Sequence, residues 1–399
     1  MRMLHTSDWH LGRTLHRADL REAQAAYLDH LVETVRSERV EAVLVSGDVY
    51  DRAIPPVDAV ALCEDGLARL RDAGARIVVI SGNHDSARRL GFASALVDQA
   101  GVYLRTRAGS LARPVLLEDR HGPVAVYGVP FLEPDAVRHD LPPSPMDPKN
   151  PNNPASHTNE TAPRGHQGVL TRATGCIRAD LATRGTARSV VMAHAWVAGG
   201  EASESERDIS VGGVGRVPAP LFDGFSYTAL GHLHGPQTLR ERLRYSGSPL
   251  PYSFSEARQA KGSWLVDLDG DGNVQVERVL APRFRRLAVL RGTLSDLLTS
   301  PAHAGHEDDF VSVVLTDTGR PEGAMDRLRR RFPHVLVLTF EPEGAETGGG
   351  TYRSRVKGRD DLAVAAEFVR HVRSSPVTEG ERDLLVAAFE AARRAEGED

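Results

Sequence analysis

The chain has 399 residues, of which 41% are hydrophobic and 26% are charged, and its formal net charge is −5. These values are typical of a globular protein with more than one domain, and they exclude a basic nucleic-acid-binding character for the chain as a whole. The presence of only 2 cysteines excludes a disulfide framework. Because the chain enters a strand at once and lacks any apolar run of roughly 20 residues, we expect a cytoplasmic protein without a membrane span.

The N-terminal part alternates short apolar runs with amphipathic stretches. The first three runs are rich in β-branched residues and occupy residues 3–6, 42–45 and 77–80. The stretches between them carry apolar residues at helical spacing. This β-α-β-α-β order predicts a parallel sheet with crossover helices. A helix is expected over residues 87–100, and strands at 102–104 and 124–129 are expected to extend the sheet.

The middle of the chain begins with a change of composition at residues 139–168, where prolines stand among Asn, Ser and Thr. We expect a disordered insertion there, because such a composition cannot bury apolar surface. A helix is expected over residues 169–181, followed by strands that end before His194 and His232. Antiparallel strands are expected to form a second sheet packed on the first, at residues 244–246, 263–268 and 274–280.

The C-terminal part divides into three predicted regions after a first domain of residues 1–281. Residues 282–341 alternate strands with an arginine-rich helix and predict a small α+β domain. Residues 342–358 contain a run of glycines and predict a flexible linker. Residues 359–399 predict two amphipathic helices, which we expect to dock on a partner or to cap the chain's own core.

Five predicted strands end in polar side chains of the kinds that bind metal ions. These residues are Asp8 and His10, Asp48, Asn83, His194, and His232 and His234. Because parallel strands end at the same edge of a sheet, we expect these side chains to converge there. Oxygen and imidazole ligands without any thiolate favour Mn²⁺, Fe²⁺, Zn²⁺ or Mg²⁺.

The number of ligands fits two metal ions. We assign Asp8, His10 and His234 to one ion and Asn83, His194 and His232 to the other. Asp48 is the carboxylate that we expect to bridge the two. Two ions about 3.5–4 Å apart activate a water and stabilise both oxygens of an in-line phosphoryl displacement. The predicted chemistry is therefore phosphoester hydrolysis.

His84 is predicted to act on the substrate instead of a metal. Its neighbour Asn83 already faces the ions, and adjacent side chains diverge. An imidazole beside the scissile phosphate can stabilise the developing charge or protonate the leaving alkoxide. The carboxylate of Asp51 is the candidate to hold the other ring nitrogen of His84.

These motifs together resemble the calcineurin-like metallophosphoesterases. The resemblance is carried by Asp8-Trp9-His10, Gly47-Asp48 through Arg52, Gly82-Asn83-His84-Asp85, His194 and Gly231-His232-Leu233-His234. More narrowly, the chain is similar to the SbcD family, the nuclease subunits of bacterial SbcCD complexes. That closer likeness is carried by Leu11-Gly12-Arg13, residues 48–56, and the segment from Tyr245-Ser246-Gly247-Ser248-Pro249 to Ser253-Phe254-Ser255-Glu256.

The resemblance implies a fold, a cofactor and partners. The fold is an α/β two-sheet sandwich flanked by helices, with a capping domain and C-terminal helices. The implied cofactors are two divalent metal ions, Mn²⁺ by preference. The implied activity is double-strand DNA exonuclease together with hairpin and single-strand endonuclease, in repair, recombination and replication. The implied partners are an SbcC-type coiled-coil ATPase that gates the site with ATP, double-stranded DNA ends and hairpins, and a second copy of the chain.

Arginines are the candidate contacts to DNA phosphates. Arg88 and Arg89 follow His84 closely and are expected to bind DNA near the metals. The resemblance adds seven arginines of the capping region, and a solvated charged face is the equal alternative for them. They are Arg283, Arg285, Arg286, Arg327, Arg329, Arg330 and Arg331.

Two other functions are open on the motifs alone. A stand-alone phosphomonoesterase or cyclic-nucleotide phosphodiesterase would use the same metal centre, because the centre does not select the substrate. The additional domain and the docking helices favour the nuclease. A DNA-binding scaffold with structural metals is the other alternative, and an uncoordinated His84 beside a full ligand set argues against it.

Overall fold

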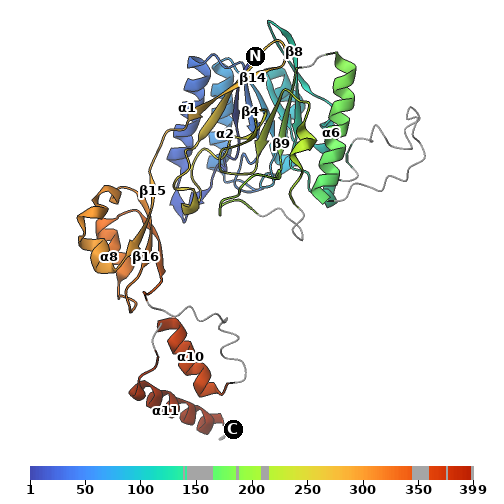
Figure 1. The fold of residues 1–399 in the computed structure, drawn as a ribbon. Coiled ribbons are helices and arrows are strands. Elements are labelled where there is room, and N and C mark those ends of the chain that lie inside the picture. Colours follow the sequence, from blue (N-terminus) through green and yellow to red (C-terminus); the bar gives the residue numbers. More distant parts are fainter. Residues whose placement is uncertain are drawn as a thin grey trace. The chain divides into compact units, whose positions relative to one another are not determined.

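The computed structural model describes residues 1–137, 140–141, 165–185, 188–207, 215–343, 359–373 and 376–396 (Figure 1). The chain forms two compact units, Met1–Phe284 and Arg285–Asp399. Among the described helices, none is long and apolar enough to cross a membrane.

The first sheet of the N-terminal unit has six strands in the order β14-β13-β1-β4-β5-β6. Its four parallel strands are β1 (Arg2–Thr6), β4 (Ala42–Ser46), β5 (Arg76–Ile80) and β6 (Val102–Arg105). The crossovers are α1 (Arg21–Ser37) and α2 (Val57–Asp72). The hairpin of β13 (Gly262–Leu268) and β14 (Val274–Leu280) adds to β1 in antiparallel fashion. The predicted β-α-β-α-β order is confirmed.

The second sheet also has six strands, in the order β11-β12-β10-β9-β8-β7. Four of them run parallel: β8 (Gly122–Val129), β9 (Ser189–His194), β10 (Tyr227–Gly231) and β12 (Leu243–Tyr245). The edges are antiparallel, with β7 (Val115–Asp119) on one side and β11 (Gln237–Arg240) on the other. The helix α6 (Gly165–Arg184) packs against this sheet.

The two sheets stack on each other and are covered by helices on their outer faces. Between the sheets, Leu44 and Val78 of the first pack with Val126 and Met192 of the second. A second core joins the first sheet to α1 and α2, and a third joins the second sheet to α6. Figure 1 shows these helices on opposite sides of the strands. The predicted architecture, an α/β two-sheet sandwich flanked by helices, is confirmed.

Three predicted strands, β8, β13 and β14, lie in the sheet other than the expected one. The strand β8 was expected to extend the first sheet, and it belongs to the second. The strands β13 and β14 were expected in the second sheet, and they join the first because β13 pairs with β1. In β8 the side chains of both faces are buried, Val124 and Val126 between the sheets and Tyr127 towards α6. Because both faces are apolar, the pattern does not distinguish the two sheets.

Two expected boundaries are also corrected. The single helix over residues 87–100 is broken into α3 (Ala87–Leu90), α4 (Ser94–Val97) and a short 3-10 turn, Asp98–Ala100. The break lies at Ala93, whose φ of 58° is left-handed and cannot continue a helix. The predicted insertion of residues 139–168 ends earlier than expected, because α6 already begins at Gly165 and His166 is buried. Most of the insertion lies outside the described residues.

The C-terminal unit contains a three-stranded parallel sheet in the order β15-β16-β17, with β15 (Leu287–Gly292), β16 (Phe310–Leu315) and β17 (Val335–Phe340). The helices α7 (Leu294–Thr299) and α8 (Ala324–Arg331) pack on it around Leu297, Leu328 and Phe332. Two amphipathic helices follow, α10 (Asp361–Arg373) and α11 (Glu379–Glu396). The predicted linker, apart from its first two residues, lies outside the described part of the chain.

Candidate metal centre

The structure brings the seven predicted metal ligands together at one edge of the sandwich. Each follows the carboxyl end of a parallel strand: β1 and β4 and β5 in the first sheet, and β9 and β10 in the second. Because the two sheets face each other with these ends on the same side, ligands almost 230 residues apart in sequence come within contact distance. The predicted convergence follows from the parallel order of the strands.

The loops that carry the ligands have an unusual backbone. Asp8, His10, Asp48 and His232 have positive φ angles of 53°, 45°, 48° and 106°. Such angles are uncommon for residues other than glycine and persist only where the surrounding structure imposes them. Backbone hydrogen bonds join the first two loops, from the amide of Asp8 to the carbonyl of Gly47 at 3.0 Å and from that of His10 to Asp48 at 2.9 Å. Strained positions at a cluster of polar side chains indicate a functional site.

Asp85 holds two of these loops together. Its carboxylate accepts hydrogen bonds from the backbone amides of Val49, Tyr50 and Gly82, at 3.1, 2.9 and 2.9 Å. These bonds join the loop after β4 to the loop after β5. Asp85 therefore positions the segments on which Asp48 and Asn83 lie, without being one of the predicted ligands.

Two glycines allow the strand ends to approach closely. A Cβ atom on Gly82 would lie 2.1 Å from the Asp48 carboxylate, and one on Gly231 would lie 1.9 Å from the carbonyl of Ser46. Neither distance is compatible with a side chain. Glycine at these positions is therefore required by packing at the site.

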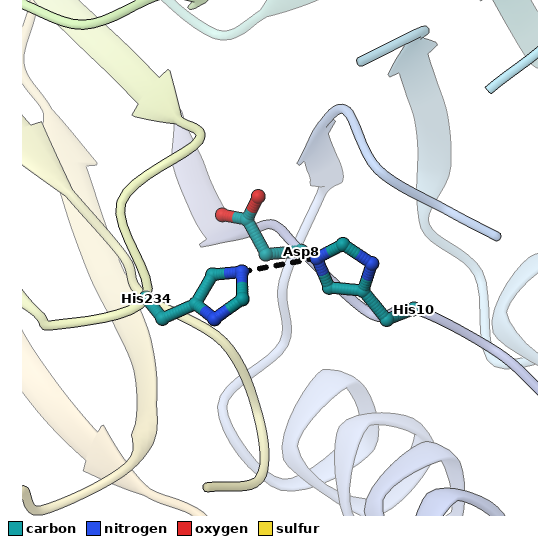
Figure 2. A group of neighbouring side chains, drawn as sticks. All are labelled: Asp8, His10 and His234. Atoms are coloured by element: carbon teal, nitrogen blue, oxygen red, sulfur yellow. Dashed lines mark hydrogen bonds between the residues drawn. The ribbon is translucent and has the colours of Figure 1, made fainter. Parts of the chain in front are cut away.

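The first predicted ligand group is Asp8, His10 and His234, which offer one ligand atom each within 4.8 Å of one another. All three side chains are buried. The two imidazoles face each other through their Nε2 atoms at 3.0 Å, as Figure 2 shows. Two ring nitrogens and a carboxylate that converge in this way form a suitable set of donors for one divalent cation.

The second predicted group meets around the side-chain oxygen of Asn83. This Oδ1 atom lies 2.9 Å from Nε2 of His194 and 3.1 Å from Nδ1 of His232. The Asp48 Oδ2 atom lies 3.5 Å from Nε2 of His194 and 3.6 Å from Nε2 of His10. Asp48 is therefore within reach of both groups, as a bridging carboxylate must be.

Burial and charge shift the pKa values of these groups. Burial raises the pKa of Asp8 to about 6 and lowers that of His232 to about 3. Burial also opposes protonation of His194, but the Asp48 carboxylate outweighs it and raises the pKa of His194 to about 9. For Asp48, burial would raise the pKa, yet the adjacent His194 holds it well below its usual range. Asp48 is thus an ionised carboxylate at the centre of the cluster, which suits it to bind cations.

The residues present fit a pair of divalent cations. Four imidazoles, two carboxylates and one amide supply nitrogen and oxygen donors and no thiolate, the mixture expected for transition metals of this class. The nitrogens without hydrogen-bond partners in the described part of the chain are Nδ1 of His10, Nδ2 of Asn83 and Nε2 of His232, and none of them is an atom that meets the other predicted ligands.

His84 lies beside the cluster and is only half buried. Its ring centroid is 4.7 Å from that of His10, and its backbone amide donates to Oδ1 of Asp48 at 2.8 Å. Its Nδ1 atom lies 2.7 Å from the backbone carbonyl of Asp51. Because a carbonyl only accepts, Nδ1 carries the proton and Nε2 is left for other partners.

The predicted role of the Asp51 carboxylate is therefore corrected. The backbone carbonyl of Asp51, and not its side chain, holds His84. The carboxylate instead lies 3.8 Å from Nδ1 of His10 and 3.7 Å from Nε of Arg13. The turn of the loop after β4 decides which atom of Asp51 faces His84, and the sequence pattern does not encode it.

Arg88 and Arg89 lie on the short helix α3, a few residues after His84, and both are exposed. Arg89 donates to the carbonyl of Ala53 at 3.1 Å, which ties α3 to the loop before α2. Among the described residues Arg88 makes no hydrogen bond or ion pair. Their contact with DNA stays a prediction.

Sequence reasoning missed the residues behind His234. These are Ser205, Glu206, Glu256 and Lys261, which contact His234 or one another. Glu256 was noted only as part of a family motif. The sequence feature that could have pointed to them is Lys261, because lysine occurs only three times in the chain. In the structure this side chain is buried, with 8% of it exposed.

Comparison with known proteins identifies both units. The family model for calcineurin-like phosphoesterases matches residues 1–141. The model SbcD_C, described as the type 5 capsule protein repressor C-terminal domain, matches residues 283–373. Among solved structures, one described as "GAP50 the anchor in the inner membrane complex of Plasmodium" has 10% identity, covering 86% of this chain and 98% of that chain. Its TM-score of 0.36 is too low to support an argument.

The first match spans β1, β4 and β5, with the predicted ligands Asp8, His10, Asp48 and Asn83 and with His84. The second spans the three-stranded sheet and α10 of the C-terminal unit. The pairing of these two domains in one chain is that of an SbcD nuclease subunit. The chain therefore carries a calcineurin-like phosphoesterase domain and an SbcD_C domain, and this combination supports a metal-dependent phosphodiesterase.

Proposed function

We propose that the protein is a Mn²⁺-dependent DNA nuclease. It digests double-stranded ends as an exonuclease and cuts hairpins and single strands as an endonuclease. It works as the nuclease subunit of an ATP-gated SbcCD-type complex in DNA repair, recombination and replication. The observation that carries this proposal is a cluster of side chains that could hold metal ions, with His84 beside it, in a chain that also has an SbcD C-terminal domain.

The residues of the site support phosphodiester hydrolysis. Two bound ions would supply a metal-activated water and positive charge for the phosphate oxygens. Asp8, His10 and His234 would hold one, Asn83, His194 and His232 the other, and Asp48 both. The carbonyl of Asp51 keeps the proton of His84 on Nδ1, so that Nε2 is free to contact the phosphate or, when protonated, the leaving oxygen.

Several of the capping arginines are engaged in bonds within their own domain, which makes them weaker candidates for contacts to DNA. Arg285, Arg286 and Arg331 are held by bonds within the domain, Arg331 to Glu307 and to the carbonyls of Leu297 and Ser300. Arg329 lies near Asp326 of its own helix. Arg327 and Arg330 line a surface hollow of the domain. They and Arg283 are the better candidates for phosphate contacts.

Exposed apolar side chains support the proposed second copy of the chain. Ile54 and Val57, before and at the start of α2, are 68% and 82% exposed, and Phe92 and Leu96, at α3 and α4, are 81% and 73% exposed. The bond from Arg89 to Ala53 shows that the two segments are neighbours. Exposed apolar groups of this size mark interaction surfaces, and we assign this apolar patch (Ile54, Val57, Phe92 and Leu96) to homodimer formation.

The helices α10 and α11 support the proposed contact with an SbcC-type ATPase. They expose Phe368, Val372 and Leu384 at 54%, 52% and 71%. An amphipathic helix with an uncovered apolar face can add to a coiled coil.

The proposal is tested by cleavage of a labelled DNA hairpin in Mn²⁺, beside hydrolysis of a generic phosphodiester. Wild type and His84→Ala are each assayed with and without the partner ATPase. DNA cleavage that requires His84 and responds to ATP when the partner is present is the expected result. Rapid hydrolysis of the small ester with intact DNA, even with the partner, would instead identify a stand-alone phosphoesterase.

A further inference from the structure

His234 is held from behind by side chains that come from distant parts of the sequence. The hydroxyl of Ser205 contacts both Nδ1 of His234 and Oε1 of Glu256. The distance from Nδ1 of His234 to Oε1 of Glu256 is 3.7 Å, so the hydroxyl lies between imidazole and carboxylate. All three side chains are buried.

This chain of contacts decides which ring nitrogen of His234 carries the proton. An ionised carboxylate can only accept, so Glu256 accepts the Ser205 hydroxyl proton. The Ser205 oxygen is then the acceptor for an N–H at Nδ1 of His234. The lone pair of the imidazole is left on Nε2, the atom that lies 3.0 Å from Nε2 of His10. Metal-binding histidines are oriented in the same manner by a carboxylate or an oxygen behind the ring.

Glu256 is itself fixed by a buried cation. It is 1% exposed, and its Oε2 lies 2.5 Å from Nζ of Lys261. Lys261 also donates to the carbonyl of His234 at 2.9 Å and to Ser248 at 3.0 Å. A buried ion pair adds little stability over an apolar pair of the same size, because both charges lose their hydration. This pair contacts the backbone carbonyl of His234 through Lys261 and reaches its ring through Glu256 and Ser205. These contacts indicate a role in orienting His234.

Hydrogen bonds also hold the backbone of His234 and the loop that carries Ser205. Oε1 of Glu206 accepts the backbone amide of His234 at 2.7 Å. The carbonyl of Ser205 accepts from Arg13 at 2.8 Å, and Arg13 lies next to the Asp51 carboxylate behind His10. The two facing imidazoles are thus each backed by a carboxylate, and Arg13 links the two supports.

We propose that Ser205 and Glu256 are positioning residues, which hold His234 with its Nε2 lone pair directed at the ion shared with Asp8 and His10. The segment Glu201–Arg207 is then part of the metal site, although it supplies no ligand. This inference rests on the proposed two-metal function.

The test is titration of the metal-free full-length protein with Mn²⁺, followed by calorimetry, and with Co²⁺, followed by its visible spectrum. Ser205→Ala is compared with wild type and with Ser255→Ala. The control removes a hydroxyl from the same pair of loops, where Ser255 accepts the amide of Glu204 and does not contact His234. We expect Ser205→Ala to weaken the binding of one of the two ions by about 10- to 100-fold and to leave the affinity for the other ion unchanged. The metal-free melting temperature should match that of the control.

A second pair of variants shows whether the two residues act through one chain. Glu256→Gln should weaken the binding of the same ion. The double variant with Ser205→Ala should lose less affinity for that ion than the product of the two single losses. If Ser205→Ala melts well below the control, Ser205→Cys is used in its place, because cysteine keeps a side chain of similar size and its S–H group is only a weak hydrogen-bond donor.

The outcomes separate this inference from the proposed function. Two ions bound by wild type and equally well by Ser205→Ala would overturn the role of Ser205 and leave the two-metal site standing. A wild type that does not bind two ions would overturn both. Selective loss of one ion in Ser205→Ala, with both retained in Ser255→Ala, supports the inference.

Discussion

At the scale of single residues, the site consists of groups whose local surroundings decide their chemistry. His10 and His84 are neighbouring imidazoles, with ring centroids 4.7 Å apart, yet their surroundings differ. His10 is fully buried and faces another predicted ligand, whereas His84 is half buried and held through Nδ1 by a backbone carbonyl. The first arrangement suits a metal ligand and the second suits a group that contacts substrate.

The variants His84→Ala and Asn83→Ala test which residues bind the metal ions and which contact the substrate. His84→Ala should retain both metal ions and lose about 10²- to 10⁴-fold in turnover, because general acid assistance is worth that much. Asn83→Ala should lose one ion, because its side-chain oxygen meets both His194 and His232. Metal content by elemental analysis and phosphodiester turnover are measured on the same samples. Loss of metal in His84→Ala would contradict the assignment.

A second residue-scale prediction concerns stability and pH. The side chain of Asp119 is buried and lies 2.5 Å from the buried guanidinium of Arg188 and 2.7 Å from the N-terminal ammonium of Met1, and these cations hold the pKa of Asp119 well below its ordinary value of 3.8. The ion pair therefore contributes fully above about pH 4, and its contribution is lost as the pH falls further, since the unfolded chain takes up the proton first. Asp119→Asn should cost about 3–5 kcal/mol at pH 7, because it leaves a buried guanidinium without its carboxylate.

Urea unfolding followed by tryptophan fluorescence measures this effect at pH 7, 5, 4 and 3. The difference between wild type and Asp119→Asn should shrink below pH 4. The control is Asp223→Asn, whose partner Arg240 is exposed, and it should change stability by less than about 1 kcal/mol at every pH. A difference that stays constant down to pH 3 would contradict the ion-pair account.

At the scale of elements, parallel strands made the site predictable. Each predicted ligand ends its strand or follows it by only a few residues, so the apolar run and the polar residue can be read together. What could not be read is which atom a loop presents. Asp51 turns its carbonyl to His84, and the Ser205 loop reaches His234 from 29 residues away in sequence. The sequence also could not predict which sheet contains β8, because Val126 and Tyr127 are buried on opposite faces of this strand.

The packing between strand ends gives an element-scale prediction. Gly82→Ala would place a Cβ 2.1 Å from the Asp48 carboxylate, so it should cost about 1–3 kcal/mol and reduce metal binding. Gly175→Ala is the matched control, because this glycine lies inside α6 with nothing within 4 Å of the added atom. The control should stabilise the protein by about 0.5–1 kcal/mol through helix propensity. Equal unfolding free energies for the two variants would contradict the packing argument.

At the scale of the whole molecule, the account combines a metal centre with surfaces that a small-substrate enzyme does not need. These surfaces are the apolar patch, the exposed apolar side chains of α10 and α11, and Arg327 and Arg330 of α8, none of which is a predicted ligand. The expectation of a partner came from a resemblance carried by motifs. Which surface each partner uses depends on exposure, which emerges only from the folded chain.

The proposed homodimer is tested by Phe92→Asp combined with Leu96→Asp. Two buried charges across a symmetric interface should convert the dimer to a monomer, because an unpaired charge is costly to bury. Leu116→Asp is the control, since Leu116 is also exposed, at 49%, but lies on the edge strand β7. Light scattering coupled to size-exclusion chromatography gives the mass. A monomeric wild type, or a dimeric double variant, would refute the assignment of the patch.

The central claim is that the cluster holds two ions in the stated arrangement. Anomalous scattering at the manganese edge, from crystals grown with Mn²⁺, tests it most directly. The account predicts two peaks about 3.5–4 Å apart. One should contact Asp8, His10 and His234, the other Asn83, His194 and His232, with Asp48 bound to both and His84 to neither. A single peak, peaks elsewhere, or a direct bond from His84 to an ion would contradict it.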